Sequence, residues 1–229
     1  MIQKKDKSIL VFRFSALGDI AMTIPVLRSF FNTYPNQKIT FVSRGFVEPL
    51  FKEFDNLEFV SVDFNNDFKG LKGLFKLFKL LRKKNIKAVA DLHNVLRTKI
   101  LNIFFKMVFI KVQSIDKGRA DRKRLTQKNN KKFKPLTPIH YRYCDVFGRL
   151  GFPIDLTNHE YPIKPFLPEN SEEQKILSKS VNKRIIGIAP FASFAGKNYP
   201  LDLMQNVIAY LQKDHIIYLF GGGENELKQ

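Results

Sequence analysis

Short runs rich in β-branched and aromatic residues alternate with stretches of helical spacing along most of this protein. In the first half, the strand-like runs are Ser8–Phe14, Lys38–Ser43, Leu57–Val62 and Ala88–Asp91. The stretches with helical spacing are Ile20–Tyr34, Asp67–Lys84, Arg97–Lys106 and His140–Leu150. Strands that are separated by helices imply βαβ units, so we expect an α/β fold in which a parallel sheet carries helices on both faces.

The alternation restarts after Glu160–Asn170, a segment that carries three prolines and is expected to be a linker. The later elements are two strand-like runs and a helical stretch between them: Arg184–Ala189, Leu201–Lys213 and His215–Phe220. We therefore expect an N-terminal Rossmann-like domain at residues 1–165 and the start of a second at residues 166–229. Two strands and one or two helices cannot bury both faces of a sheet, so the second domain is expected to be incomplete and the sequence to be truncated at its C-terminal end.

The charge balance favours polyanionic partners, because 39 basic residues against 21 acidic ones give a net charge of +18. The densest basic segment is Lys117–Lys134, which holds nine Lys or Arg residues and is expected to be a mobile loop. Cys144 is the only cysteine, and no apolar run reaches the roughly 18–20 residues that a membrane span needs. These features favour a soluble protein of the cytoplasm.

Leu71–Lys84 has the pattern of a basic amphipathic helix. Its apolar face consists of Leu71, Leu74, Phe75, Phe78 and Leu81. Such a helix can lie on an anionic membrane. The ordinary interpretation, in which the apolar stripe packs on the sheet, is favoured. The Lys117–Lys134 segment is the better candidate for contact with a polyanion.

Ser15-Ala16-Leu17-Gly18-Asp19 joins the first strand to the first helix. Ligands of open α/β sheets bind beyond the carboxyl ends of the strands, and Gly18 lets a substrate approach the backbone closely. A helix that begins near Ile20 would keep Asp19 ionised, so this carboxylate could accept a proton from a substrate hydroxyl. The spacing alone favours a simpler role, in which Asp19 caps the helix.

Four motifs, in order, change this balance. The first runs from Ile9 to Ser43 and matches a Ser-x-x-Gly-Asp turn, a Thr-x-Pro-x-Leu-Arg helix and a Tyr-Pro turn. The others are Asp91-Leu92-His93 with Arg97-Thr98, Ala192-Ser193 with Lys197-Asn198-Tyr199-Pro200, and Phe220-Gly221-Gly222-Gly223-Glu224. Together they resemble the heptosyltransferases, glycosyltransferase family nine, although Tyr199 stands where that family usually has Trp.

The resemblance implies a GT-B architecture, in which two Rossmann-like domains bind the acceptor and the nucleotide-sugar. It implies an inverting transfer without metal or cofactor, from an ADP-heptose-like donor to a phosphorylated lipid A–core acceptor, with Asp19 as the base. The implied acceptor-binding residues are Ser15, Gly18, His93 and Arg97. The implied donor-binding residues are Ser193, Lys197, Gly221, Gly222 and Glu224. A monomer with peripheral contact at the inner face of the inner membrane is expected.

One departure from the family leaves two other functions open. The Asp-Ser/Thr-Gly segment that the family carries later in its second domain is absent from this sequence. An inactive, truncated remnant of the enzyme is therefore one alternative. A non-catalytic nucleotide- or nucleic-acid-binding α/β protein is the other, although no RNP, KH or zinc-finger pattern supports specific binding of nucleic acid.

Overall fold

The computed structural model describes residues 7–129, 131, 133–157, 171–178, 183–192, 194–222 and 226. The linker expected at Glu160–Asn170 lies outside these residues. The protein divides into two compact units, Met1–Pro162 and Ile163–Gln229, and each is described by itself.

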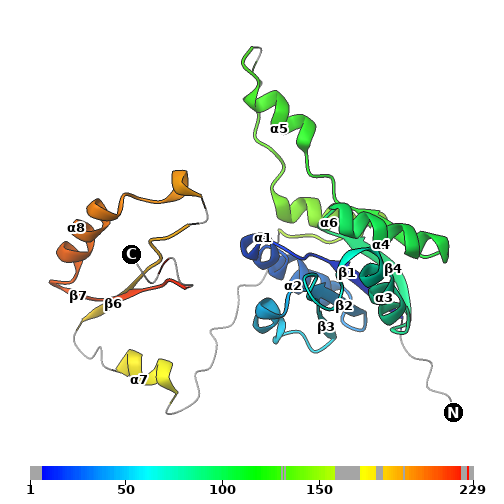
Figure 1. Ribbon diagram of the computed structural model, residues 1–229, viewed down its shortest axis with the longest axis horizontal. Helices are drawn as coiled ribbons and strands as arrows, with labels where there is room; N and C mark the ends of the chain where they lie inside the picture. Colours follow the sequence, from blue (N-terminus) through cyan, green and yellow to red (C-terminus); the bar gives the residue numbers. More distant parts are fainter. Residues whose placement is uncertain are drawn as a thin grey trace. The chain divides into compact units, whose positions relative to one another are not determined.

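The first unit is built on a five-stranded sheet in which every pair of neighbouring strands is parallel. Its strands are β1 (Ser8–Phe12), β2 (Lys38–Ser43), β3 (Leu57–Ser61), β4 (Ile86–Asp91) and β5 (Lys111–Ser114). The order across the sheet is β3-β2-β1-β4-β5, so the backbone leaves β1 in one direction and later returns to its other side (Figure 1). The prediction of a parallel α/β fold is confirmed.

Helices cover both faces of this sheet, as expected. One face carries α1 (Leu17–Ala21), α2 (Ile24–Thr33) and α6 (Ile139–Leu150), together with the 3-10 turn η1 (Gly45–Phe51). The other face carries α3 (Gly70–Arg82) and α4 (Leu96–Met107). Ile9 and Val11 of β1 belong to the first core, whereas Leu10 and Phe12 belong to the second, because side chains alternate along a strand.

The prediction of a single helix at Ile20–Tyr34 is wrong, because the structure has two helices there, α1 and α2. A continuous helix would need the residue at position 25 to donate its N–H to the carbonyl of Ala21, but that residue is Pro25. The first helix begins earlier than expected, at Leu17, and its N-cap is Ala16. Asp19 therefore lies in the first turn, and its interpretation as the helix cap is also wrong.

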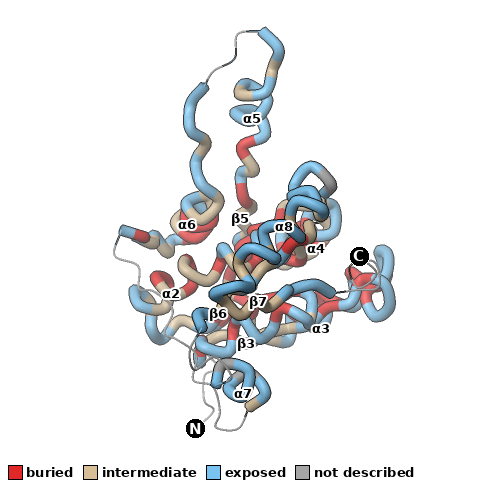
Figure 2. Tube along the Cα trace, turned by 90° about the vertical axis from the view of Figure 1, so that its left-hand side faces the viewer, coloured by how far each residue is buried: buried red, intermediate tan, exposed pale blue. Residues whose placement is uncertain are grey.

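The loop expected at Lys117–Lys134 contains a helix instead, α5 (Arg119–Thr126). The side chain of Asp116 accepts a hydrogen bond from the backbone N–H of Gly118 at 2.8 Å, and Gly118 takes the left-handed conformation just before the helix. No residue of α5 is buried, and the segment projects away from the sheet in both views (Figures 1 and 2). The basic residues and the lack of apolar periodicity predicted a loop, but Lys, Arg and Ala are good helix formers.

The amphipathic helix α3 packs on the sheet, as the favoured interpretation predicted, but with a narrower stripe. Leu74, Phe78 and Leu81 are buried, whereas Leu71 is 63% exposed and Phe75 is 44% exposed. Part of the expected apolar face therefore remains at the surface.

The second unit holds the two-stranded parallel sheet of β6 (Arg184–Ile188) and β7 (His215–Leu219). Its helical elements are α7 (Glu172–Ser178), the 3-10 turn η2 (Ala195–Lys197) and α8 (Leu201–Leu211). None of the residues of α8 is buried. Among the helices that the structure describes, none is long and apolar enough to cross a membrane.

Candidate active site

The carboxyl ends of β1 and β4 meet at the centre of the first sheet. Phe12, the last residue of β1, pairs with Asp91, the last residue of β4, and Leu92 donates its N–H to the carbonyl of Phe12 at 3.1 Å. On one side of β1 the sheet continues with β2 and β3, and on the other side it continues with β4 and β5. The order of the strands therefore reverses between β1 and β4. Open α/β sheets bind their ligands at this switch point, so the segments that follow the two strands form the candidate site.

Asp19 lies at this site in an ion pair with Arg13, whose guanidinium donates to Oδ2 of the carboxylate. The Arg13 side chain is 7% exposed, whereas that of Asp19 is 47% exposed. A second nitrogen of Arg13 donates to the carbonyl of Leu92 at 2.9 Å, and this bond anchors the guanidinium to the end of β4. No described residue donates a hydrogen bond to Oδ1 of Asp19, so Arg13 holds one oxygen of this half-exposed carboxylate and leaves the other available.

Tyr143 of α6 fixes the backbone of the same turn. Its hydroxyl donates to the carbonyl of Asp19 at 3.1 Å, and the guanidinium of Arg13 lies 6.0 Å from its ring. Burial, ahead of any charge, raises the pKa of Tyr143 to about 12. Tyr143 is therefore a neutral donor that holds Asp19 rather than an acid that exchanges protons.

Ser15 and His93 meet across the switch point. Nδ1 of His93 accepts a hydrogen bond from the backbone N–H of Phe14 at 3.4 Å, so the ring proton resides on Nε2. That nitrogen lies 3.4 Å from Oγ of Ser15 and can donate to it, which leaves the Ser15 hydroxyl proton available to a ligand. A Cβ placed on Gly18 would meet no atom within 4 Å, so the space beside this turn is open.

His93 is neutral in this environment. Burial lowers its pKa to about 4, and the positive charges of Arg13, Lys117 and Arg44 act in the same direction. Burial also lowers the pKa of Lys117, with Arg119 and Arg13 contributing. The switch point is therefore surrounded by several cations that affect the same histidine.

We expect this histidine to make stability fall as the solution is acidified. Because the pKa is lower in the folded protein than in the unfolded state, the unfolded state binds more protons between about pH 6.5 and pH 4. The contribution of His93 to the free energy of unfolding is thus fully present above pH 6.5. It falls by about 2 kcal/mol as the pH is lowered toward 4. Urea unfolding of wild type and His93→Gln should show that the variant loses less stability over this range. Parallel losses in the two proteins would contradict the assignment.

Asp91 organises the loop that carries His93. The buried carboxylate accepts hydrogen bonds from the backbone N–H groups of His93 at 3.0 Å and Asn94 at 2.7 Å. Its second oxygen accepts from the amide of Asn102 at 2.7 Å and the hydroxyl of Ser114 at 3.3 Å. One carboxylate therefore joins the ends of β4 and β5 to α4.

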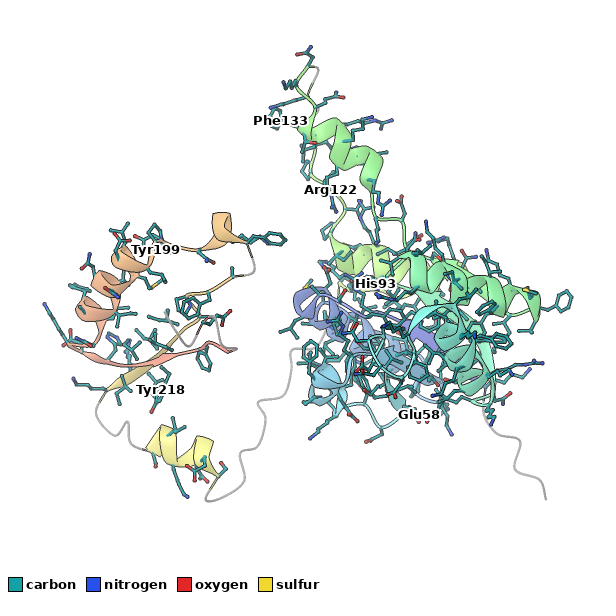
Figure 3. All side chains as sticks on the ribbon, viewed as in Figure 1. Glu58, His93, Arg122, Phe133, Tyr199 and Tyr218 are labelled. Carbon is teal, nitrogen blue, oxygen red and sulfur yellow. The ribbon has the colours of Figure 1, made fainter. Side chains whose placement is uncertain are left out.

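Arg97 occupies a neighbouring hollow instead of joining the group around Asp19. Its guanidinium lies 5.1 Å from the ring of Phe64, and it lines a cavity of about 380 Å³ together with Arg44, Asp63 and Asn65. The cavity follows the carboxyl ends of β2 and β3, on the same edge of the sheet. Figure 3 shows His93 at this edge and Glu58 of β3 at the opposite one.

The predicted donor residues are only partly described. Lys197 is exposed in η2, with its ammonium 5.7 Å from the ring of Phe194. Gly221 and Gly222 follow the carboxyl end of β7. Ser193 and Glu224 lie outside the described residues. Among the described residues, no hydrogen bond joins Lys197 to Gly221 or Gly222. In the described part of the protein, no group of three or more His, Cys, Asp or Glu could hold a metal ion.

Sequence reasoning missed Arg13, Arg44, Lys117 and Tyr143. Arg13 had a visible signal, since it is a charge inside an otherwise apolar strand-like run. Tyr143 had none, because it lies 124 residues from the aspartate that it contacts.

Comparison with solved structures identifies the fold as that of GT-B glycosyltransferases. A glycosyl transferase of family 9 from Veillonella parvula superposes with a TM-score of 0.72 at 19% identity, over 100% of this chain and 66% of that one. E. coli heptosyltransferase WaaC, solved with ADP, gives a TM-score of 0.64 at 18% identity, over 96% of this protein and 70% of WaaC. These likenesses show the architecture.

Sequence comparison identifies the family. The profile of glycosyltransferase family 9 (heptosyltransferase) matches residues 74–229. The protein belongs to this family. The lipopolysaccharide core heptosyltransferase OpsX of Haemophilus influenzae is 26% identical over 103 residues, which are 45% of this chain and 29% of OpsX. The sequence spans 66% of the length of the Veillonella protein, and the OpsX match covers less than a third of that relative.

Proposed function

We propose that this protein transfers a heptose, or a similar sugar, from an ADP-sugar to a lipopolysaccharide core or lipid A acceptor, with inversion. In this reaction Oδ1 of Asp19 takes the proton from an acceptor hydroxyl while the hydroxyl oxygen bonds to the anomeric carbon. The bond between that carbon and the diphosphate oxygen breaks on the opposite side, and ADP leaves with the electron pair. Attack opposite the leaving group inverts the anomeric centre.

The observation that carries this proposal is the arrangement of Asp19 and Arg13 at the switch point. A general base must be ionised, oriented and accessible to the hydroxyl that it deprotonates. The buried guanidinium of Arg13 fixes one oxygen of the carboxylate, and the other lies at a half-exposed surface. Ser15 and neutral His93 lie beside it as hydrogen-bonding groups for the same substrate.

The cations around the site favour an anionic acceptor. Arg97 and Arg44 line the adjoining hollow, and Lys117 is close enough to affect the pKa of His93. Guanidinium groups bind phosphate and carboxylate bidentately, so a phosphorylated glycolipid fits this edge of the sheet. OpsX is named for the lipopolysaccharide core, which agrees with this class of acceptor.

The proposed donor is ADP-heptose, because WaaC has been solved with ADP and with ADP-2-deoxy-2-fluoro heptose. We assign Lys197, with Ser193, to stabilise the departing diphosphate without a metal or cofactor. We assign Gly221, Gly222 and Glu224 to the nucleotide. A fixed positive charge near a leaving diphosphate stabilises the charge that develops in the transition state. We further propose that the protein acts as a monomer in the cytoplasm, where such a donor and a membrane-bound acceptor meet.

Removing the Lys197 ammonium should impair catalysis selectively. We expect Lys197→Ala to lower kcat by about 100-fold, the typical cost of losing one group that stabilises transition-state charge. The measurement is ADP release from ADP-heptose in the presence of a lipid A–core acceptor.

Lys213→Ala is the matched control, since the Lys213 ammonium also lies 5.7 Å from an aromatic ring, that of Tyr210. It should remain within about twofold of wild type, as expected of a surface change away from the site. An unchanged kcat in Lys197→Ala would refute the role of this lysine. Absence of transfer by the wild-type protein would refute the proposed activity.

A further inference from the structure

Helix α4 is apolar on its outer face as well as on the face that it buries. Leu101 and Phe105 pack in the core beneath it. On the outside, Leu96 is 74% exposed, Ile103 is 56% exposed and Met107 is 72% exposed. A helix at the surface of a globular protein is normally polar on its outer side. The outer face of α4 therefore has the composition of a docking surface.

Two neighbouring features extend this face. Phe109 follows the helix at a left-handed backbone position, φ 59°, and its side chain is 98% exposed. Phe75 of α3 is 44% exposed and lies 5.6 Å from Phe104 of α4, ring centroid to ring centroid. The apolar surface thus includes the exposed edge of α3. We call this surface the α3–α4 face, and its apolar members are Leu71, Phe75, Leu96, Ile103, Met107 and Phe109.

The charge of this part of the protein has one sign. Residues 69–114 contain twelve Lys or Arg residues and one acidic residue, Asp91, which is fully buried. Lys99 and Lys106 are exposed on α4 itself. The exposed lysines of α3 are Lys72, Lys76 and Lys79. The apolar side chains are therefore accompanied only by exposed cations.

We propose that the α3–α4 face docks this protein on an anionic lipid surface. Apolar side chains can enter the boundary between head groups and acyl chains while lysines extend their ammonium groups to anionic head groups. A second copy of the protein fits this face poorly, because it would place like charges opposite one another. An anionic bilayer supplies the opposite charge along the whole face.

The direction of α4 links this surface to the candidate site. The helix begins at Leu96, three residues after His93, and Arg97 in its first turn lines the hollow beside the switch point. Its twelve residues span about 18 Å. A helix that lies along the bilayer would therefore bring the amino end of α4, and with it the hollow lined by Arg97, close to the membrane surface. This last link depends on the proposed function, whereas the docking itself does not.

The test is co-sedimentation of the protein with vesicles of phosphatidylcholine, alone or with 30% phosphatidylglycerol. Wild type should bind the anionic vesicles and not the neutral ones. Lys99→Gln with Lys106→Gln should weaken binding about 25-fold, because each basic residue near an anionic leaflet contributes about fivefold in affinity, or about 1 kcal/mol. Ile103→Gln with Met107→Gln and Phe109→Gln should weaken it by at least about tenfold, as expected when buried apolar area is lost.

Arg122→Gln with Lys123→Gln is the matched control, because it removes the same net charge from the exposed helix α5 (Figure 3). This control variant should weaken vesicle binding less than about threefold, because it lowers only the net charge of the protein. Equal losses in the control and in the α4 lysine variant would overturn the proposal, as would full binding by the apolar variant. Self-association of wild type that the apolar variant abolishes would assign the face to a second copy instead. Circular dichroism of every variant separates these results from unfolding.

Discussion

Replacing Asp19 with asparagine is expected to lower the rate of sugar transfer by about 10²–10⁴-fold, the typical contribution of a positioned general base. Asparagine has nearly the same shape and can still accept a hydrogen bond from Arg13, but its amide cannot take the proton of an acceptor hydroxyl. The loss should therefore appear in kcat, with a smaller change in the KM of the acceptor. Steady-state rates at saturating ADP-heptose, measured as ADP release, test this directly.

Two further variants separate chemistry from folding. Asp145→Asn changes another half-exposed aspartate that pairs with an arginine of its own helix α6, Arg149 at 2.9 Å. It should keep the wild-type rate. Asp19→Glu retains the charge that Arg13 requires and should recover part of the activity lost in the asparagine variant. A kcat for Asp19→Asn close to that of wild type, in a protein that unfolds at the wild-type temperature, would exclude Asp19 as the base.

The fold was predictable because its signals are local. The strand Lys38–Ser43 occurs with the bounds expected from its β-branched and aromatic residues. Two errors also have local causes. Pro25 divides the first helix by removing one hydrogen bond, and α5 is a solvent-exposed helix whose basic residues lack apolar periodicity. The strand β5 was missed because only four residues, none of them fully buried, form it at the edge of the sheet.

The candidate site was only partly predictable, because ion pairs and hydrogen bonds between distant segments leave little trace in a local pattern. Asp19 could be expected at the carboxyl end of a strand, and the family resemblance added Ser15 and His93 to the same site. The role of Arg13 depends on the carbonyl of Leu92, 79 residues away. Arg97 belongs to the same edge of the sheet but to another hollow, because α4 carries it toward β2 and β3. The roles of Ser193 and Glu224 stay predictions.

Loss of the Asp91 carboxylate should give the largest stability effect of any substitution considered in the first unit. Asp91→Ala leaves two backbone N–H groups and the Ser114 hydroxyl without their acceptor. The Asn102 amide loses its shorter bond and keeps only the one to Oγ of Ser114 at 3.2 Å. Each unsatisfied buried group costs about 1–3 kcal/mol, and partial access of water to the loop reduces the sum. We expect a loss of about 3 kcal/mol in the free energy of unfolding, measured by urea denaturation.

Asp91→Asn should be much milder, with a loss of about 1 kcal/mol, the net value of a typical hydrogen bond. The side-chain oxygen of Asn102 is buried, and no described residue donates to it. If the Asn102 amide rotates by half a turn, this oxygen can accept from the new side-chain NH₂ at position 91, while the new carbonyl oxygen keeps the two backbone donors. The double variant Asp91→Asn with Asn102→Ala removes that rescue and should approach the alanine variant.

Asp63 offers a matched control for the backbone part of this effect. It follows β3 as Asp91 ends β4, and it accepts hydrogen bonds from the N–H groups two and three residues ahead, at 2.7 and 3.3 Å. Its carboxylate is exposed, so water can replace it, and Asp63→Ala should lose far less stability than Asp91→Ala. Equal losses at the two positions would mean that the turn alone, and not the buried network that joins β4, β5 and α4, accounts for the effect. Because that network sets the position of His93, a destabilising Asp91 variant should also lower transfer activity at temperatures where the protein remains folded.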